Sequence, residues 1–368
     1  MDSHRSVSVV IPTIRERFVQ RAVSAALTQQ EVNTEVIVIA DGPEVADLGN
    51  TLEKSERVRV VCRPKLQGVT NARNAGVELA AHDWIAFLDD DDIWAPDKLE
   101  RQFEALGEQG GEFAYTAAAI LDVDLNLVRY EVAPPYPELL DTLKANNLLP
   151  ATASNLLVTR RLFDAIGGFD LGLKHFSDWD FALKLAREAP GAACAEPLVG
   201  YVHHDEGMHV QQVADVESEW ADFQRTWADS GLELGSVDQI RWVAEGHQRR
   251  GHRRTAARLY VRAAREFGNK SDLARAVRAL LGERVTRTAA SLQSRRAAPP
   301  GPPPEWVTRY RQGDGRAATG RAPDSASASR TSPGGDSVSA DSESVRPAVS
   351  PMTANKINSG TSGEIDRG

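Results

Sequence analysis

Four consecutive aspartates, Asp89 to Asp92, form the densest group of chemically active side chains in the sequence. They lie in the stretch FLDDDDIWAPDKL, directly after an apolar run. Near a protein surface, two such charges in contact repel by about 4 kcal/mol at an effective dielectric constant of about 20. The run is therefore either a solvated turn whose side chains spread into water, or a site where carboxylate oxygens hold Mg²⁺ or Mn²⁺.

Two other families with acidic loops do not fit this run. An EF-hand read from Asp89 would place Ile93 at a ligand position and Trp94 where glycine is required. A phosphatase of the haloacid-dehalogenase type would need Asp-x-Asp-x-Thr/Val after the first strand. The run instead follows the fourth predicted strand and has Ile93 in the last position. Both alternatives are disfavoured.

The aspartates end one of several short, β-branched segments that alternate with helix-like segments. Such alternation, with strands that are apolar throughout, is typical of a parallel sheet covered by helices on both faces. We therefore predict an α/β fold with a mostly parallel sheet flanked by helices. Ligands of such sheets bind beyond the carboxyl ends of the strands, which is where the aspartates lie. The strand-like segments are VSVVI, EVIVIA, VRVVCRP and DWIAFL, and the helix-like ones are FVQRAVSAALTQQ and GVTNARNAGVELA.

Composition divides the chain into three parts. Residues 1–212 carry the α/β pattern and form the first predicted domain. Residues 213–293 are rich in arginine and place apolar residues at helical spacing, which predicts a helical C-terminal region. Residues 294–368 are rich in Pro, Ser and Gly and bury too little apolar surface to offset their ordering entropy, which predicts a disordered tail. Inside it, WVTRYR at Trp306–Arg311 is either a short docking segment or an ordinary loop.

The bulk properties exclude several classes of protein. The 368-residue chain has a formal net charge of −9 and a pI near 5.5, which argues against a nucleic-acid-binding protein. Cys62 and Cys194 lack the spacing of a zinc site or a disulfide framework. Without a membrane-spanning apolar run or a signal-peptide layout, we expect a cytoplasmic protein. The arginine-rich helical region is either a solvated surface or a peripheral contact with the inner face of a membrane.

The loops after the strands lack the glycine-rich patterns of common nucleotide-binding turns. PTIRER follows the first strand and ADGPE the second, and neither contains GxGxxG or GxxxxGKS/T. The phosphates of a nucleotide bound here would have to be neutralised by a cation and by arginine. The aspartates can hold the cation, and Arg73 in NARNAG lies on the helix that leads into their strand.

These motifs together resemble the family 2 glycosyltransferases, which are inverting enzymes of the GT-A fold. The resemblance covers residues 7–209 and rests on motifs that occur in the family's order. They are VSVVIPT, EVIVIADG, GVTNARNAGVELAAHDWIAFLDDDDIWAPDKLE and GGFDLGLKHFSDWDFALKL. The resemblance implies a nucleotide-sugar donor, a divalent metal and a carboxylate base.

The resemblance assigns residues to the donor. Pro12 and Thr13, at the turn after the first strand, would hold the nucleoside together with Asp41, which would accept a hydrogen bond from the base. Arg73 would lie near the diphosphate, and its alternative is a charge on a surface helix. Asp90 would lie near the ribose.

The metal assignment also comes from the resemblance. Asp89 and Asp91 frame the family's Asp-x-Asp motif and would bind Mn²⁺ or Mg²⁺, with Asp91 as the direct ligand. Asp92 and Trp94 would be structural, with Asp92 directed toward the turn that starts the next helix.

A histidine after the closing strand completes the implied metal set. In LVGYVHHDEGMH, His204 is the candidate that reaches the metal or the diphosphate, with His203 as the alternative and His209 as a third. Adjacent strand residues point to opposite faces, so we expect at most one of the first two to serve.

The implied catalytic base is Asp178, within Ser177-Asp178-Trp179-Asp180. The family's acidic motif stands at this place and opens a helix after the GGFD turn. In a purely structural reading, Ser177 is the N-cap and Asp178 a first-turn charge that favours the helix dipole. The two readings are compatible. Asp180 would support the base or bind the acceptor.

We therefore expect a metal-dependent inverting glycosyltransferase that moves a sugar from a UDP-linked donor to an acceptor hydroxyl, in polysaccharide or glycoconjugate synthesis. The acceptor would be a saccharide, a lipid-linked molecule or another hydroxyl compound. One alternative is a non-catalytic scaffold or binding protein on the same fold. Another is a nucleotidyltransferase, which PTIRER disfavours because such enzymes carry a glycine-rich loop after the first strand.

Overall fold

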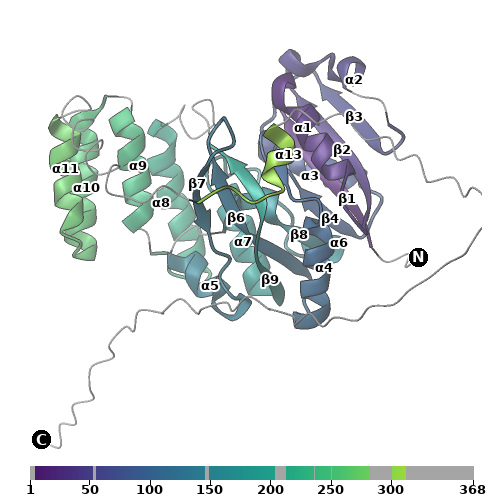
Figure 1. The fold of residues 1–368 in the computed structure, drawn as a ribbon. Helices are drawn as coiled ribbons and strands as arrows, with labels where there is room; N and C mark the ends of the chain where they lie inside the picture. Colours follow the sequence, from purple (N-terminus) through teal and green to yellow (C-terminus); the bar gives the residue numbers. More distant parts are fainter. Residues whose placement is uncertain are drawn as a thin grey trace, which may run out of the picture. The chain divides into compact units, whose positions relative to one another are not determined.

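The computed structural model describes most of the chain up to residue 281 and a short segment beyond it. Its elements carry the labels of Figure 1. The described residues are 5–52, 55–145, 149–203, 213–235, 237–249, 251–281 and 301–311. The strands are β1 (Ser6–Thr13), β2 (Asn33–Asp41), β3 (Val58–Arg63), β4 (Trp84–Phe87), β5 (Ile93–Trp94), β6 (Phe113–Leu121), β7 (Leu127–Glu131), β8 (Leu157–Thr159) and β9 (Gly191–Val202).

Helices connect and follow these strands. The α-helices are α1 (Glu16–Leu27), α2 (Leu48–Thr51), α3 (Val69–Leu79), α4 (Lys98–Gln109), α5 (Tyr136–Ala145), α6 (Arg160–Ala165), α7 (Ser177–Glu188), α8 (Val213–Asp229), α9 (Val237–Arg249), α10 (Arg253–Phe267), α11 (Ser271–Leu281) and α13 (Val307–Arg311). Two 3-10 turns, η1 (Pro43–Val45) and η2 (Thr152–Asn155), lie between them. Among the described helices, none has both the length and the apolar character needed to cross a bilayer.

The predicted α/β sheet is confirmed, and its first half is parallel. β3, β2, β1 and β4 lie side by side in that order, with all three pairs parallel (Figure 1). β1 is central to this half because Val10 pairs with Ile37 on one side and with Phe87 on the other. The continuous apolar strands of the sequence thus form a sheet whose carboxyl ends meet at one edge.

The second half of the sheet is mixed rather than parallel. β8 runs antiparallel to β4 and β6, whereas β6 and β9 form a long parallel pair. β5 and β7 add antiparallel partners to β9 and β6. Short connections make such antiparallel pairs accessible, as between β6 and β7, whereas a parallel pair needs a crossover. The expectation of a mostly parallel sheet therefore holds for the strands that precede the aspartates.

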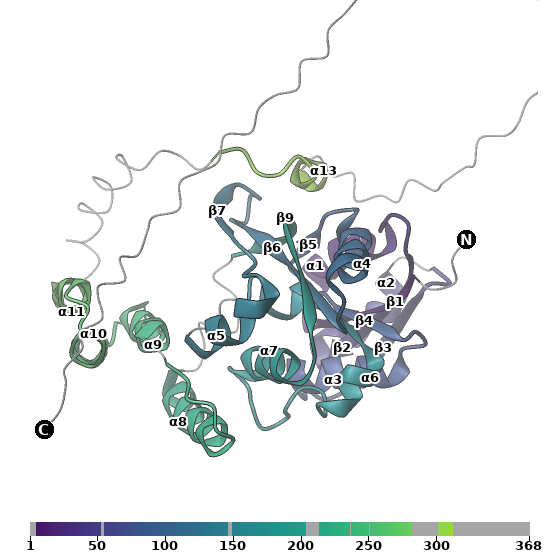
Figure 2. The ribbon, with the colours of Figure 1, turned by 90° about the horizontal axis from the view of Figure 1, so that it is seen from below.

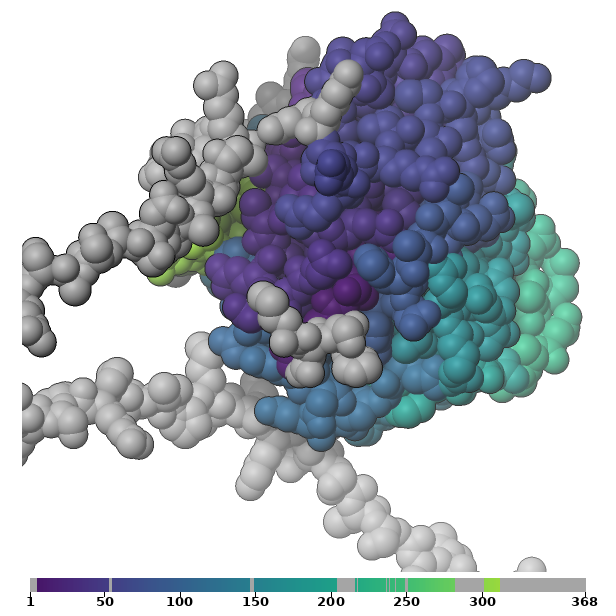
Figure 3. All heavy atoms as spheres, turned by 90° about the vertical axis from the view of Figure 1, so that its right-hand side faces the viewer, coloured from purple at the N-terminus to yellow at the C-terminus, as the bar shows by residue number. Residues whose placement is uncertain are grey.

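Helices cover both faces of the sheet (Figure 2). On one face, Val9 and Ile11 of β1 pack in a cluster with α1 and Leu99 of α4. On the other, Val10 packs with Val77 of α3 and with residues of α7. Alternate residues of β1 thus face opposite layers, as the two-residue period of a strand requires. Figure 3 shows the face formed by the N-terminal elements, in purple and blue, beside later elements in teal.

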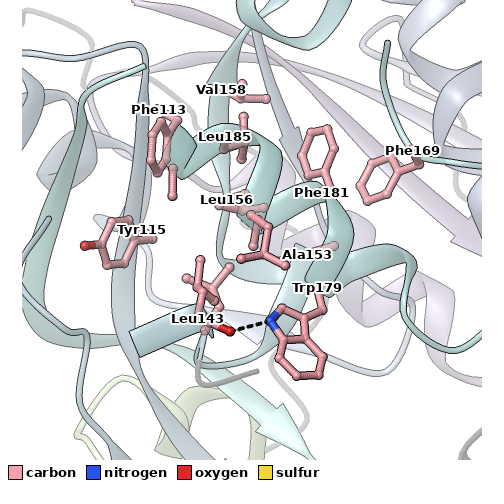
Figure 4. Packing of buried hydrophobic residues seen from close by; sticks show 14 of the residues in the cluster. Phe113, Tyr115, Leu143, Ala153, Leu156, Val158, Phe169, Trp179, Phe181 and Leu185 are labelled. Atoms are coloured by element: carbon pink, nitrogen blue, oxygen red, sulfur yellow. Dashed lines mark hydrogen bonds between the residues drawn. The ribbon is translucent and has the colours of Figure 1, made fainter. Parts of the chain in front are cut away.

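The largest core cluster lies between the sheet and α7 (Figure 4). The rings of Phe169 and Phe181 stack with centroids 4.0 Å apart, and Phe87 meets both edge-on. The indole Nε1 of Trp179 donates to the carbonyl of Leu143 over 2.8 Å, which satisfies a polar group that would be costly to bury alone. This cluster fixes α7, the helix that carries Asp178.

The first helix of the C-terminal region packs on α7. The ring of Trp220 stacks on Trp179 with centroids 5.3 Å apart, and Phe223 stacks on Phe176 at 5.4 Å. Further along, α9, α10 and α11 share a small alanine-rich cluster. The buried Asp272 of α11 links this helix to α9 through an ion pair with Arg241, and it also pairs with Arg275 one turn further along α11. The helical character predicted for this region agrees with these helices.

Part of the predicted tail forms ordered structure. Residues 301–311 include α13, and Val307 is fully buried in a cluster with Ile93 and Val202. The indole of Trp306 donates to the carbonyl of Pro197 over 3.2 Å. WVTRYR is therefore a docking segment, and the rest of the predicted tail lies outside the described residues.

A glycine sets the distance between α3 and β1. A Cβ atom at Gly76 would lie 2.2 Å from Cγ1 of Val10. We predict that Gly76→Ala destabilises the protein by about 1–2 kcal/mol, because overpacking outweighs the gain in helix propensity. Gly107 of α4 has open space at the same position, so Gly107→Ala should stabilise by about 0.5–1 kcal/mol. Urea unfolding of both variants checks this pair, and a stabilising Gly76→Ala would contradict the close packing.

Lys98 is a fully buried cation without a carboxylate partner among the described residues. Its Nζ lies 2.8 Å from Oε1 of Gln102 and 4.1 Å from the centre of the Trp94 ring. Burial lowers the pKa of Lys98 from 10.5 to about 7. Between these two pH values the unfolded chain binds the proton and the folded chain does not, so the protein should gain stability as the pH rises through this window.

We predict that Lys98→Met removes this pH dependence. At pH 7 the variant should be more stable than the parent by about 1–3 kcal/mol, since the desolvation cost disappears while Gln102 loses a hydrogen bond. As the pH rises toward 10, the free energy of unfolding of the parent should approach that of the variant. Unfolding free energies from urea titrations at pH 7 and 9.5 measure the difference. Parallel pH profiles for the two proteins would refute the assignment.

Candidate functional site at the carboxyl end of β4

The aspartate run forms the loop between β4 and β5, and its side chains alternate in exposure. The side chains of Asp89 and Asp91 are 25% and 16% exposed. Those of Asp90 and Asp92 are buried. Asp89 and Asp91 can therefore contact a ligand, whereas the carboxylates of Asp90 and Asp92 make contacts within the protein.

Arg73 joins the aspartate loop to the predicted base. Its guanidinium donates from Nη2 to Oδ1 of Asp89 over 2.6 Å and from Nη1 to Oδ1 of Asp178 over 2.5 Å. The side chain is 2% exposed, so both ion pairs are shielded from water. Although burial alone would lower it, the two carboxylates raise the pKa of Arg73 above its usual value. The alternative of a surface helix charge is thus wrong, and Arg73 lies at the centre of the site.

Arg15 bridges the next two aspartates. Its Nη2 lies 2.7 Å from Oδ1 of Asp90 and 2.7 Å from Oδ2 of Asp91. The hydroxyl of Thr13 donates to the other oxygen of Asp90 over 2.6 Å. PTIRER, the turn after β1, therefore reaches the aspartate loop through two of its residues.

Ser154 of η2 fixes the loop from the interior. Its hydroxyl accepts from the backbone N–H of Asp89 at 3.0 Å and donates to Oδ2 of Asp92 at 2.6 Å. Its carbonyl accepts from the indole of Trp94 at 2.8 Å. The other oxygen of Asp92 accepts from the N–H of Val202. These contacts agree with a structural role for Asp92 and Trp94. The expected direction of Asp92 is wrong, because its carboxylate contacts Ser154 and Val202 instead of the turn that starts the next helix.

The loop concentrates negative charge in a partly desolvated place. Burial, together with repulsion from Asp91, raises the pKa of Asp90 to about 6 in spite of Arg15. Burial also raises the pKa of Asp89 and, more strongly, that of Asp92. Burial, together with the negative charge of the aspartates, also raises the pKa of Tyr201.

The donor set suits a divalent cation. Carboxylate oxygens are the ligands that Mg²⁺ and Mn²⁺ prefer, and the raised pKa values show that added positive charge would be stabilising here. Within the described ranges no group of three or more His, Cys, Asp or Glu side chains is arranged to hold a metal ion. His204 and His209 lie outside the described residues. His203 is exposed, and its ring meets that of Tyr201 edge-on.

Asp41 is anchored in the protein at the end of β2. Its carboxylate accepts from the backbone N–H groups of Gln67 and Gly68, at 2.7–3.1 Å, and lies 3.8 Å from the guanidinium of Arg63. It thereby holds the loop that starts α3. Pro12 is buried in β1. That these residues hold a nucleoside stays a prediction.

Asp178 lies in the first turn of α7, where its side chain is 23% exposed. Its Oδ2 accepts no hydrogen bond from the described residues, so this oxygen can take a proton. The prediction that Ser177 is the N-cap of α7 is wrong. The N-cap position is Phe176, and no side chain makes a capping hydrogen bond there. Instead, Oε1 of Glu219 in α8 accepts from the N–H groups of Lys174, His175 and Phe176.

Asp180 lies in the packing between α7 and α8. It is buried, accepts from the indole of Trp227 over 3.1 Å and pairs with Lys184. These contacts give it a supporting role within the helices. Acceptor binding by Asp180 stays a prediction.

Three residues that contact the aspartate loop were not assigned from the sequence: Arg15, Arg21 and Ser154. The signal for Arg15 was its place in the turn after β1, beside Thr13. Arg21, one turn into α1, donates to the carbonyl of Asp91 over 2.8 Å. Ser154 had no local signal, because its partners lie more than 60 residues away in the chain.

Three curated relatives show what the chain is similar to. An uncharacterized glycosyltransferase of Haemophilus influenzae is 28% identical over 50% of this chain and 62% of its own. The succinoglycan biosynthesis protein ExoO of Rhizobium meliloti is 30% identical over 50% of this chain and 56% of its own. The UDP-Glc:alpha-D-GlcNAc-diphosphoundecaprenol beta-1,3-glucosyltransferase WfgD of Escherichia coli is 31% identical over 35% of this chain and 51% of its own. The chain thus spans little more than half the length of these relatives.

A solved structure and a family model complete the comparison. TarS 1–349 of S. aureus in complex with UDP aligns with a TM-score of 0.46 and 16% identity, over 67% of this chain and 72% of that one. Residues 8–167 match the model of glycosyl transferase family 2, and they include most of β1, the aspartate loop, Arg15 and Arg73. This part of the chain is therefore similar to glycosyl transferase family 2.

Proposed function

We propose that the protein is a metal-dependent inverting glycosyltransferase of the GT-A type that transfers a sugar from a UDP-linked donor to an acceptor hydroxyl. The observation that carries the proposal is the ion-pair chain from Asp89 through the buried Arg73 to Asp178. It holds a carboxylate of the metal loop and the candidate base on one guanidinium. A carboxylate proposed to hold the cation and a carboxylate proposed as the base are thereby held next to each other.

The acidic surplus of the site supports metal dependence. Two guanidiniums, from Arg15 and Arg73, face four carboxylates in ion pairs. Asp89 and Asp91, the more exposed members of the loop, would hold Mn²⁺ or Mg²⁺. Bound there, the cation would supply Lewis-acid stabilisation of the leaving diphosphate. Arg73 and Arg15 would orient these carboxylates and add positive charge near the phosphates.

Asp178 has the properties required of the base. The acceptor hydroxyl must lose its proton as it attacks the sugar carbon, and a carboxylate within hydrogen-bond reach can take that proton. Arg73 holds Oδ1 of Asp178 and so fixes the direction of Oδ2. Since inversion takes place in one displacement, a single base on the face opposite the leaving group is sufficient.

The relatives support the class of donor and acceptor. WfgD is named for a UDP-Glc donor and a diphosphoundecaprenol-linked acceptor, and ExoO for succinoglycan biosynthesis. We therefore favour a UDP-sugar donor and a saccharide or lipid-linked acceptor in polysaccharide or glycoconjugate synthesis. A nucleotidyltransferase and a non-catalytic scaffold are the alternatives. Hydrolysis of UDP-, GDP- and dTDP-sugars, with and without Mn²⁺, separates all three.

A peripheral membrane contact is the proposed role of the basic helical region. The exposed face of α11 carries four large apolar side chains, each between 47% and 57% exposed. The surrounding residues 253–281 hold eight Arg or Lys and two acidic side chains. An apolar stripe flanked by cations suits an anionic lipid surface, which would also bring the site to a lipid-linked acceptor. The four residues are Leu273, Val277, Leu280 and Leu281.

We predict that Asp91→Ala abolishes transfer and metal-dependent UDP binding, because a ligand of the cation is lost. Asp178→Asn should keep UDP binding and lower turnover by about 10²–10⁴-fold, because the amide cannot accept the proton. Calorimetry with UDP and Mn²⁺, together with a donor-transfer assay, measures both effects. The matched control is Asp97→Asn, whose carboxylate pairs only with an exposed arginine among the described residues. Parent-level transfer by Asp178→Asn would show that another group is the base.

We also predict that the protein sediments with vesicles containing phosphatidylglycerol and much less with neutral phosphatidylcholine vesicles. The double variant Val277→Asp and Leu280→Asp should lose this binding, because it places charge in the apolar stripe. Val132→Asp, at a side chain that is 77% exposed on another part of the surface, should retain it. Higher salt should weaken the binding, since the arginine contribution is screened. If both variants bind the vesicles equally well, α11 does not take part in the membrane contact.

A further inference from the structure

The docking segment WVTRYR, with the described residues 301–305 before it, lies over the two strands that border the site. Val307 packs with Ile93 of β5 and with Val202 at the end of β9. β5 directly follows the aspartate loop, and β9 leads to His203 and the residues after it. A segment about 200 residues later in the chain therefore supports both sides of the site.

Tyr310 is the residue of this segment that reaches the loop. Its hydroxyl donates to the carbonyl of Trp94 over 2.7 Å, two residues after the last aspartate. Its ring packs with the cluster that contains Trp94. The pKa of Tyr310 is raised by burial, so the hydroxyl keeps its proton and stays a donor at neutral pH.

Arg21 contacts the aspartate loop from the side of α1. Its Nη2 donates to the carbonyl of Asp91 over 2.8 Å. Its guanidinium carbon lies 6.0 Å from the centre of the Phe18 ring. Its Nε is buried without a partner among the described residues.

We propose that Tyr310 is a positioning residue for the aspartate loop, acting through the Trp94 carbonyl, while Arg21 contacts the loop separately from α1. Ser154 holds the loop from the interior, and Tyr310 and Arg21 hold its outer side. The loop is then clamped between the β-sheet core and a segment from the far end of the chain. The consequence for nucleotide binding rests on the proposed function, whereas the clamping itself does not.

The test compares Tyr310→Phe with the parent in the full-length chain. Loss of the hydroxyl should speed hydrogen exchange in the peptide that covers residues 88–98 by about five- to tenfold, because the hydrogen bond on Trp94 is removed. UDP affinity in the presence of Mn²⁺ should fall by a similar factor. The KM for the donor should rise more than kcat falls, since the loop binds the donor and does not take the proton.

Two controls separate positioning from general support. Tyr130→Phe removes another hydroxyl that contacts the same segment, at the carbonyl of Pro302, but away from the loop. Val307→Ala leaves a cavity under α13 and should lower the melting temperature. Tyr130→Phe should leave exchange in 88–98 and UDP affinity at the parent level, whereas Val307→Ala, which removes packing on Ile93 within that peptide, measures the loss of general support from α13.

Each outcome decides the proposal. Faster exchange in 88–98 for Tyr310→Phe, with parent-level exchange for Tyr130→Phe, supports it. Unchanged exchange overturns it, and so does equal acceleration in Tyr130→Phe, which would make the segment a general support. A parent that binds no UDP with Mn²⁺ would refute the proposed function, while the exchange data would still decide the role of Tyr310.

Discussion

Charge compensation at the end of β4 is the constraint on which the rest of the site depends. Carboxylates in contact at this partly buried place would repel by about 4 kcal/mol a pair at an effective dielectric constant of about 20. Arg73 separates Asp89 from Asp178, and Arg15 neutralises Asp90 and Asp91 from the other side. The positions of these cations therefore determine where each carboxylate lies. The elements that carry the cations, α3 and the turn after β1, must in turn be fixed.

The packing fixes those elements closely. α3 approaches β1 at Gly76, where a side chain would collide with Val10, and this contact sets how far Arg73 reaches. On the opposite side, α8 contributes to the placement of the base. Glu219 accepts the N–H groups that precede α7, and Trp220 stacks on Trp179, next to Asp178. The helical region is thus coupled physically to Asp178, the proposed base.

The sequence predicted the features that are local or follow from strand order. Four continuous apolar runs gave four parallel strands, and Asp89 and Asp91 lie at a strand end as expected. The sequence could not predict the mixed second half of the sheet or the partners of Ser154. These depend on pairings between residues far apart in the chain, for which no local period exists. The missing N-cap at Ser177 has the same origin, since Glu219 accepts the N–H groups before the helix.

The two guanidiniums of the site differ in how readily they can move when a donor enters. The side chain of Arg73 is 2% exposed and holds two carboxylates, so its withdrawal would leave a charge buried without a partner. The side chain of Arg15 is 25% exposed, and solvent can replace part of its interaction with Asp90 and Asp91. Ligand entry near Asp91 therefore costs least if Arg15 moves and Arg73 stays. Arg73 on α3 then stays in place when a ligand enters, and it keeps Asp178 in the same orientation.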